Sequence, residues 1–138
     1  MNMVLWVLQA LLAVAFLAHG WLFLLPPAEL VDQINASLPR WFQLFIGVAE
    51  VLAAVGLTLP GLTRILPWLV ICAAVGIMIV TASATVFHVA RGEMGSAATT
   101  LVLFGIAAFV AYMRYRVVPL PARGAGNHLG AFRRSTAG

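Results

Sequence analysis

Three ionisable side chains interrupt long apolar stretches of the sequence. They are His19, Glu50 and His88, and Arg91 follows the last of them by three residues. A carboxylate and an imidazole can exchange protons, and both can hydrogen-bond a polar head group inside an apolar pocket. Because an unpaired carboxylate is costly to bury, we expect Glu50 to have a partner, and we predict that this partner is a histidine.

Each of these side chains also has a purely structural interpretation. Glu50 and His19 could form a hydrogen-bonded pair that fixes helix register, and His88 could be a polar residue that ends a helix beside Arg91. Gln9 is interpreted as a hydrogen bond between helices rather than as part of a site. Since charge is a costly way to obtain packing, we weight a functional role above a structural one for Glu50.

Several cofactor chemistries can be compared with this residue set. Two histidines could ligate a haem, but the small residues near them favour closer helix packing than a porphyrin allows. The ligand types also suit zinc or non-haem iron, yet the tight H-x-x-x-H and E-x-x-H spacings do not occur, so we predict no metal site. The single cysteine, Cys72, allows no CxxC redox pair. A quinone site needs only hydrogen-bonding His and Glu in an apolar pocket, and quinone is the ligand that we favour.

The chain as a whole is too apolar to fold as a water-soluble domain. Of its 138 residues, 63% are apolar and only 9% are charged, and the mean hydropathy is +1.04. Such a chain has too few polar residues to cover a globule, so its expected surroundings are a lipid bilayer. This composition excludes nucleic-acid readers, secreted disulfide scaffolds and disordered linkers.

Four apolar runs can cross a membrane as helices. They occupy residues 3–25, 41–59, 65–90 and 97–116, close to the ~20 residues that a ~30 Å hydrocarbon core requires. Pro26-Pro27 stops the first run, and Pro60-Gly61 predicts a turn after the second. The connector 29–40 has apolar residues at helical spacing, which favours a short interfacial helix. The predicted fold is an all-α, integral membrane four-helix bundle.

Helical spacing places the polar residues on shared faces. One stripe of the second run holds Gln43, Gly47, Glu50 and Ala54, and one stripe of the third holds Thr81, Thr85 and His88. At 1.5 Å per residue, Glu50 lies ~14 Å and His19 ~9 Å below the outer ends of their spans, whereas His88 is only ~3–5 Å deep. We therefore predict a polar or ligand site in the outer half of the bundle, made from His19, Glu50, His88, Gln43 and Arg91, without assigning a catalytic residue.

The basic residues indicate a topology. All eight are arginine, and with four acids they give a net charge of +4. Five of them follow Tyr112, where we interpret them as a flank that faces anionic lipid. Six arginines near one side against two near the other favour a cytoplasmic location for both termini. Residues 1–118 are the predicted membrane domain, and residues 119–138 are predicted to be a flexible basic cytoplasmic tail.

Short motifs in these runs carry a family resemblance. They are Phe16-Leu17-Ala18-His19-Gly20, Gly47-Val48-Ala49-Glu50-Val51-Leu52, the following Gly56-Leu57, and His88. Over residues 3–118 the sequence resembles the DoxX-like family of small bacterial membrane proteins. The resemblance implies four spans in the bacterial inner membrane and recurrent polar positions at His19, Glu50 and His88. Many relatives have a lysine shortly after the His-Gly of the first span, whereas residues 21–25 here contain none.

The resemblance also suggests a class of function. Family members have been associated with a thiosulfate:quinone oxidoreductase subunit and with other membrane oxidoreductase complexes. It thus implies the membrane component of a quinone-linked oxidoreductase system, with a partner subunit that supplies the redox centre. The alternative is a non-catalytic accessory, assembly or scaffold subunit of a membrane complex, and a carrier of a small lipid-like molecule is a third. Association with further copies of the chain and whether the chain is itself an enzyme are left open.

Overall fold

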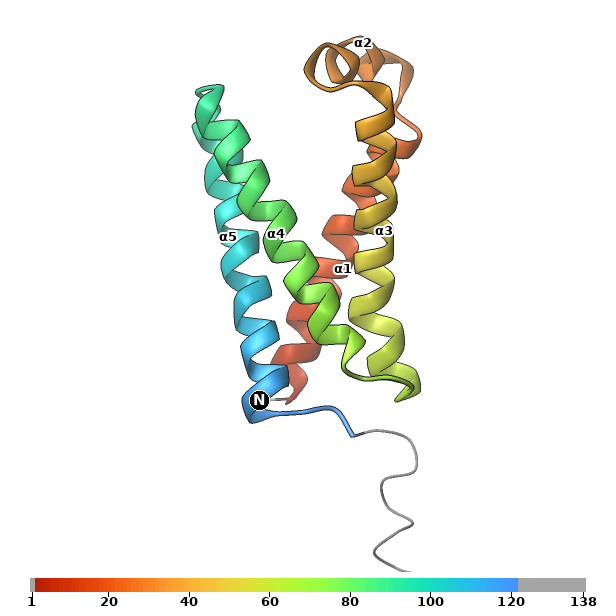
Figure 1. Ribbon diagram of the computed structural model, residues 1–138, viewed down its shortest axis with the longest axis vertical. Coiled ribbons are helices and arrows are strands. Elements are labelled where there is room, and N and C mark those ends of the chain that lie inside the picture. The colour runs from red at the N-terminus through yellow and green to blue at the C-terminus, as the bar shows by residue number, and fades with distance from the viewer. Residues whose placement is uncertain (1, 122–138) are drawn as a thin grey trace, which may run out of the picture.

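The computed structural model describes residues 2–121, which form five α-helices and a closing π-helical turn (Figure 1). In chain order these are α1 (Asn2–Leu24), α2 (Ala28–Ser37), α3 (Arg40–Thr63), α4 (Leu69–Ala90), α5 (Met94–Tyr112) and η1 (Met113–Val117). Four of them, α1, α3, α4 and α5 continued by η1, are long and apolar enough to cross a membrane. The predicted all-α membrane fold is therefore confirmed.

The end of α3 differs from the prediction. The helix runs through Pro60 and ends only after Thr63, where Arg64 takes a left-handed conformation with φ 58°. Pro60 lies in the last turn, so the hydrogen bond that it cannot donate is lost at a point where the helix is already ending. Gly61 is needed for packing rather than for a turn, because a Cβ there would lie 2.8 Å from the ring of Trp6. The predicted turn at Pro60-Gly61 is wrong.

The beginning of the third span also differs. Helix α4 starts at Leu69 rather than at residue 65, since the preceding segment forms a loop in which Leu66 has a φ of 49°. Leu66 precedes Pro67, and the residue before a proline is disfavoured in the α-helical region. The short helix expected in the first connector is present as α2, and none of its residues is buried.

The four long helices form two antiparallel pairs that diverge toward one end. Helix α1 packs along α3, α4 packs along α5, and α3 also contacts α4. The pairs lie close together near the N-terminus and are farther apart at the end that carries α2 (Figure 1), which we call the α2 end. His19 of α1 and Glu50 of α3 both lie in the halves of their helices that are nearer to this end.

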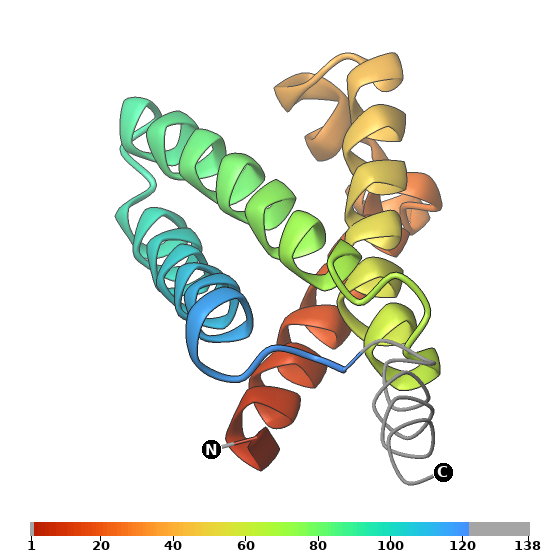
Figure 2. The same ribbon diagram turned by 60° about the horizontal axis from the view of Figure 1, so that its bottom comes forward.

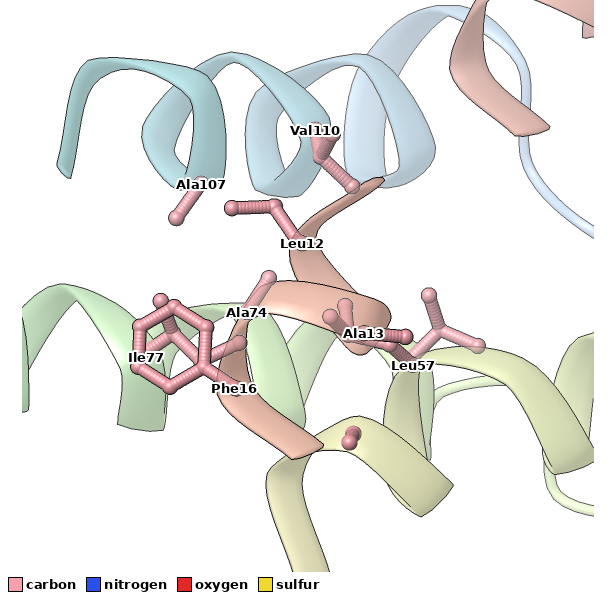
Figure 3. Packing of buried hydrophobic residues seen from close by; sticks show 10 residues of the cluster. Leu12, Ala13, Phe16, Leu57, Ala74, Ile77, Ala107 and Val110 are labelled. Atoms are coloured by element: carbon pink, nitrogen blue, oxygen red, sulfur yellow. The ribbon is translucent and has the colours of Figure 1, made fainter. Parts of the chain in front are cut away.

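A compact apolar cluster joins α1, α3, α4 and α5 (Figure 3). Its buried members are Leu12, Ala13, Phe16, Ala54, Leu57, Val70, Ala74, Ile77, Ala107 and Val110. Large apolar side chains such as Phe45, Leu52 and Ile79 are instead exposed on the outside, as expected for helices that face lipid. After η1, the chain crosses the base of the bundle toward α3 (Figure 2), and Leu120 packs against the cluster. Residues 122–138, most of the predicted tail, lie outside the described residues.

Candidate functional site

Glu50 contacts His19 across the interface between α1 and α3. Its Oε2 lies 2.8 Å from Nδ1 of the imidazole, so the predicted histidine partner of Glu50 is His19. The side chain of Glu50 is 4% exposed, whereas that of His19 is 53% exposed. The pair thus extends from the buried interface to an open surface. With Nδ1 engaged, Nε2 of His19 has no hydrogen-bond partner among residues 2–121.

Two glycines allow α1 and α3 to approach closely at this pair. A Cβ on Gly20 would lie 2.9 Å from the carbonyl oxygen of Gly47 and 3.1 Å from Cβ of Glu50. A Cβ on Gly47 would lie 2.9 Å from the carbonyl oxygen of Gly20. The two backbones therefore touch where His19 and Glu50 leave their helices, which is how small residues act in membrane helix pairs. In the G-x-x-E pattern, Gly47 permits the close approach of the two helices. Glu50, one turn later on the same face, can therefore reach His19.

His19 and Glu50 line a cleft of about 610 Å³ between the diverging helix pairs. Its other polar lining residues come from α4 and α5 and are Thr81, His88, Ser96, Thr99 and Thr100, while its apolar lining includes Phe16, Val80 and Leu103. Small-molecule sites typically have volumes of roughly 300–1,000 Å³ and mostly apolar walls with a few polar groups. The cleft has these properties.

Threonines join α4 to α5 beside the cleft. Thr85 Oγ1 lies 2.8 Å from Thr100 Oγ1 and donates to the carbonyl oxygen of Thr81 at 2.7 Å. Thr81 Oγ1 donates in turn to the carbonyl oxygen of Ile77 at 2.7 Å. These hydroxyls are satisfied within the protein. In the polar stripe predicted on the third span, Thr85 therefore contributes to helix packing, whereas Thr81 and His88 line the cleft.

His88 lies at the rim of the cleft and bonds to a different acid. Its Nδ1 is 2.6 Å from Oε2 of Glu93, and Arg91 Nε donates to Oε1 of the same carboxylate at 2.8 Å. The structure thus brings His88 and Arg91 together but joins neither to the His19–Glu50 pair. Glu93 is not among the predicted site residues, although an acid directly before a helix that follows a basic loop is a recognisable signal. The hydrogen bonds from Arg91 and then from His88 hold the pKa of Glu93 below its ordinary value.

The rim cluster is expected to weaken in acid. Since the pKa of Glu93 in the folded protein lies below its ordinary value of 4.5, its stabilising effect is complete above that value and disappears as the pH falls through the lower pKa. Thermal unfolding of the wild type and of Glu93→Gln in detergent should show a higher Tm for the wild type at about pH 5, and this difference should shrink as the pH falls further. A Tm difference that widens below about pH 5 would contradict the expected sign.

Gln43 lies apart from the cleft, at the α2 end. Its Nε2 donates to Oδ1 of Asn35 at 3.0 Å, and its Oε1 accepts from Arg40 Nη1 at 3.2 Å. Arg40 also donates to the carbonyl oxygens of Phe23 and Leu24, each at 2.9 Å. These are among the last carbonyls of α1, which have no partner within the helix. Gln43 and Arg40 thereby hold α2 over the end of α1, and the structure does not bring Gln43 to the His19–Glu50 pair.

A buried polar cluster at the opposite end of the bundle centres on Arg114. Arg114 is 2% exposed, its Nε donates to Oε1 of Gln9 at 2.7 Å, and its Nη1 donates to Oδ1 of Asn2 at 2.8 Å. Gln9 Nε2 donates to the carbonyl oxygen of Leu57 at 2.7 Å, so the expected hydrogen bond between helices is present. The guanidinium carbon lies 5.4 Å from the ring centroid of Trp6.

The interpretation of Arg114 as part of a lipid-facing flank is therefore wrong. Arg114 continues the buried face of α5 that carries Ala107 and Val110, and residues at this spacing share one side of a helix. Its side chain consequently points inward toward α1. A count of arginines near the span ends does not show which side of the helix each arginine occupies.

Comparison with known proteins identifies one family for this chain. A model of the DoxX-like family matches residues 7–110, a segment that includes His19, Glu50 and His88. No curated protein and no solved structure matches the chain. Within residues 2–121, no group of three or more His, Cys, Asp or Glu side chains is arranged to hold a metal ion. Because the matched segment covers well over half of the sequence, the chain belongs to the DoxX-like family.

Proposed function

We propose that the protein is the membrane component of a quinone-linked oxidoreductase system and that His19 accepts a proton from a quinol bound in the cleft. One observation carries the proposal. The buried carboxylate of Glu50 engages Nδ1 of an imidazole that lines the cleft and whose Nε2 is not otherwise bonded. A carboxylate that accepts the Nδ1 proton leaves the Nε2 lone pair available, which is how histidine is oriented as a general base in many enzymes.

A quinol suits the cleft because it combines an apolar ring with hydroxyl groups. Its ring would pack against Phe16 and Leu103, and one hydroxyl would hydrogen-bond to Nε2 of His19. In the proton transfer, the quinol O–H bond breaks and an N–H bond forms at Nε2. Glu50 then stabilises the resulting imidazolium. The electrons of the quinol pass to a redox centre on a partner subunit, and the chain acts in the bacterial inner membrane with both termini in the cytoplasm.

The cost of burying an acid supports a role beyond packing. Glu50 lies in the middle of α3, in the membrane-spanning part of the chain, where an ionisable group is expensive. The glycines at positions 20 and 47 already allow close helix contact without it. The competing hypothesis, a non-catalytic accessory subunit, would require the pair only to hold α1 against α3.

The quinol-oxidising activity of membranes that contain the chain and its native partners tests the proposal. His19→Ala and Glu50→Gln are expected to lower this activity by about 100-fold, the usual contribution of a general base. Ser83→Ala is the control, because Ser83 is exposed and bonds only to the carbonyl oxygen of Ile79 within its own helix. Partner co-purification is measured in parallel to exclude misfolding. Unchanged activity in both variants, with partners still bound, would reject proton transfer and favour the accessory role.

A further inference from the structure

A second cavity of about 620 Å³ lies between α3 and α4, and we call it the α3–α4 groove. Its hollow is formed in part by small residues, among them Ala49, Ala53, Ala73 and Gly76. Glu50 and Cys72 are its only lining residues that are not apolar. A Cβ added to Gly56 would lie 2.9 Å from Cβ of Ala73, so α3 and α4 are in close contact there. Toward the α2 end the two helices diverge (Figure 1).

The groove and the polar cleft meet at three residues. Phe16, Glu50 and Val80 line both cavities. The hydroxyl and imidazole groups lie on the cleft side, whereas the walls of the groove are hydrocarbon. The cleft side of Glu50 thus carries hydrogen-bonding groups and the groove side carries hydrocarbon walls. The two neighbouring cavities together suit an elongated molecule with a polar head and a hydrocarbon tail.

We infer that the ligand is such an amphiphile, with its polar head at His19 and its hydrocarbon tail in the α3–α4 groove. The inference rests on the proposed function for the head group and adds the position of the tail. The groove offers hydrocarbon walls beside the position of the head, because it shares the lining residues Phe16, Glu50 and Val80 with the cleft. A head group without a tail would occupy the cleft alone.

Gly76 offers a way to close the groove without disturbing the rest of the fold. It lines the groove, yet a Cβ built on it would have no atom within 4 Å, so a leucine side chain would project into open space. Gly105 of α5 is the matched control, because its added Cβ also meets nothing within 4 Å and it lines neither cavity. Both replacements add the same side chain to a membrane-spanning helix.

The experiment titrates the full chain in phosphatidylcholine nanodiscs with a dimethoxy-methyl-benzoquinol, kept reduced under anaerobic conditions, that carries either no tail or a decyl tail. Binding is followed by quenching of tryptophan fluorescence. Gly76→Leu should raise the Kd of the decyl compound by about 10-fold or more and leave that of the tail-less compound unchanged within about 2-fold. Gly105→Leu should change neither value. Equal binding of the decyl compound to Gly76→Leu and wild type would overturn the inference, as would an equal loss for both compounds.

Cys72 supplies an independent measurement in the unmodified chain. It is the single cysteine of the sequence, it is exposed and it lines the groove. Saturation with the decyl compound should slow its alkylation by a lipid-soluble maleimide, followed by mass spectrometry, whereas the tail-less compound should not. Equal rates with both compounds would overturn the tail position. His19→Ala distinguishes failure of the proposed function from failure of the inference about the tail. If neither compound loses affinity in that variant, the proposed function fails. If both compounds require His19 but bind equally well with and without the tail, only the inference fails.

Discussion

Gln9→Leu is expected to lower the free energy of unfolding by about 3–5 kcal/mol, the range seen when one partner of a buried charged contact is removed. Gln9 is fully buried, and its Oε1 accepts the hydrogen bond from Nε of Arg114. Leucine would leave that nitrogen without an acceptor inside the bundle. Nη2 of Arg114 already lacks a partner within residues 2–121, so the guanidinium has little to compensate for a further loss.

A double-mutant cycle distinguishes this explanation from simple loss of packing. Arg114→Met removes the charge and leaves only neutral amide groups unsatisfied, which costs about 1–3 kcal/mol. The double variant Gln9→Leu with Arg114→Met should be more stable than the sum of the two losses predicts, because apolar groups then replace both partners. Gln33→Leu, on the exposed surface of α2, is the control and should change stability by less than about 0.5 kcal/mol. Reversible unfolding in mixed detergent micelles measures all four values, and strictly additive losses would contradict the account.

Arg114 also illustrates a limit of reading membrane sequences. Arginines at span ends are usually interpreted through lipid charge and topology, and that interpretation ignores which side of the helix they occupy. In a membrane helix, most faces are apolar whether they contact lipid or protein, so an amphipathic stripe rarely marks the packed side. Here the buried face of α5 carries small and branched apolar residues that resemble those on its exposed face. A polar partner such as Gln9 is therefore the informative signal.

The contact between His19 and Glu50 was predictable for the converse reason. Gln43, Gly47, Glu50 and Ala54 form a polar and small stripe in an otherwise apolar helix, and all four are buried in the structure. Such a stripe identifies the packed face, and the cost of an unpaired carboxylate identifies the kind of partner. The shared stripe also led us to place Gln43 in the same site. In the structure, its amide is instead bonded to Asn35 and Arg40 at the α2 end. Shared helix face does not imply shared site when residues are two turns apart.

The cleft itself could not be predicted from the sequence. It exists because the α1–α3 pair and the α4–α5 pair diverge toward the α2 end (Figure 1). That geometry depends on where close contacts fall along each helix, such as Gly20 against Gly47 and Gly56 against Ala73. Glycine and alanine are common in membrane helices, so their presence indicates close packing without identifying which pairs meet.

Gly20→Val is expected to lower the free energy of unfolding by about 3 kcal/mol, at the upper end of the cost of overpacking. Its first side-chain atom would lie 2.9 Å from a backbone carbonyl oxygen of Gly47 and 3.1 Å from Cβ of Glu50. A backbone atom cannot rotate away as a flexible side chain can, so α1 and α3 must separate. The separation would lengthen the 2.8 Å contact between His19 and Glu50 and should therefore also weaken any binding that depends on this pair.

Gly105→Val separates this steric effect from the general consequence of adding a β-branched residue to a membrane helix. Gly105 has open space around its added Cβ, so valine there should alter stability by no more than about 1 kcal/mol. The free energies of unfolding of both variants are measured in the same detergent, together with their affinity for the tail-less benzoquinol. If Gly20→Val proves as stable as Gly105→Val, the two helices do not touch at Gly20 and Gly47. The position of His19 against Glu50 would then depend on the other contacts between α1 and α3.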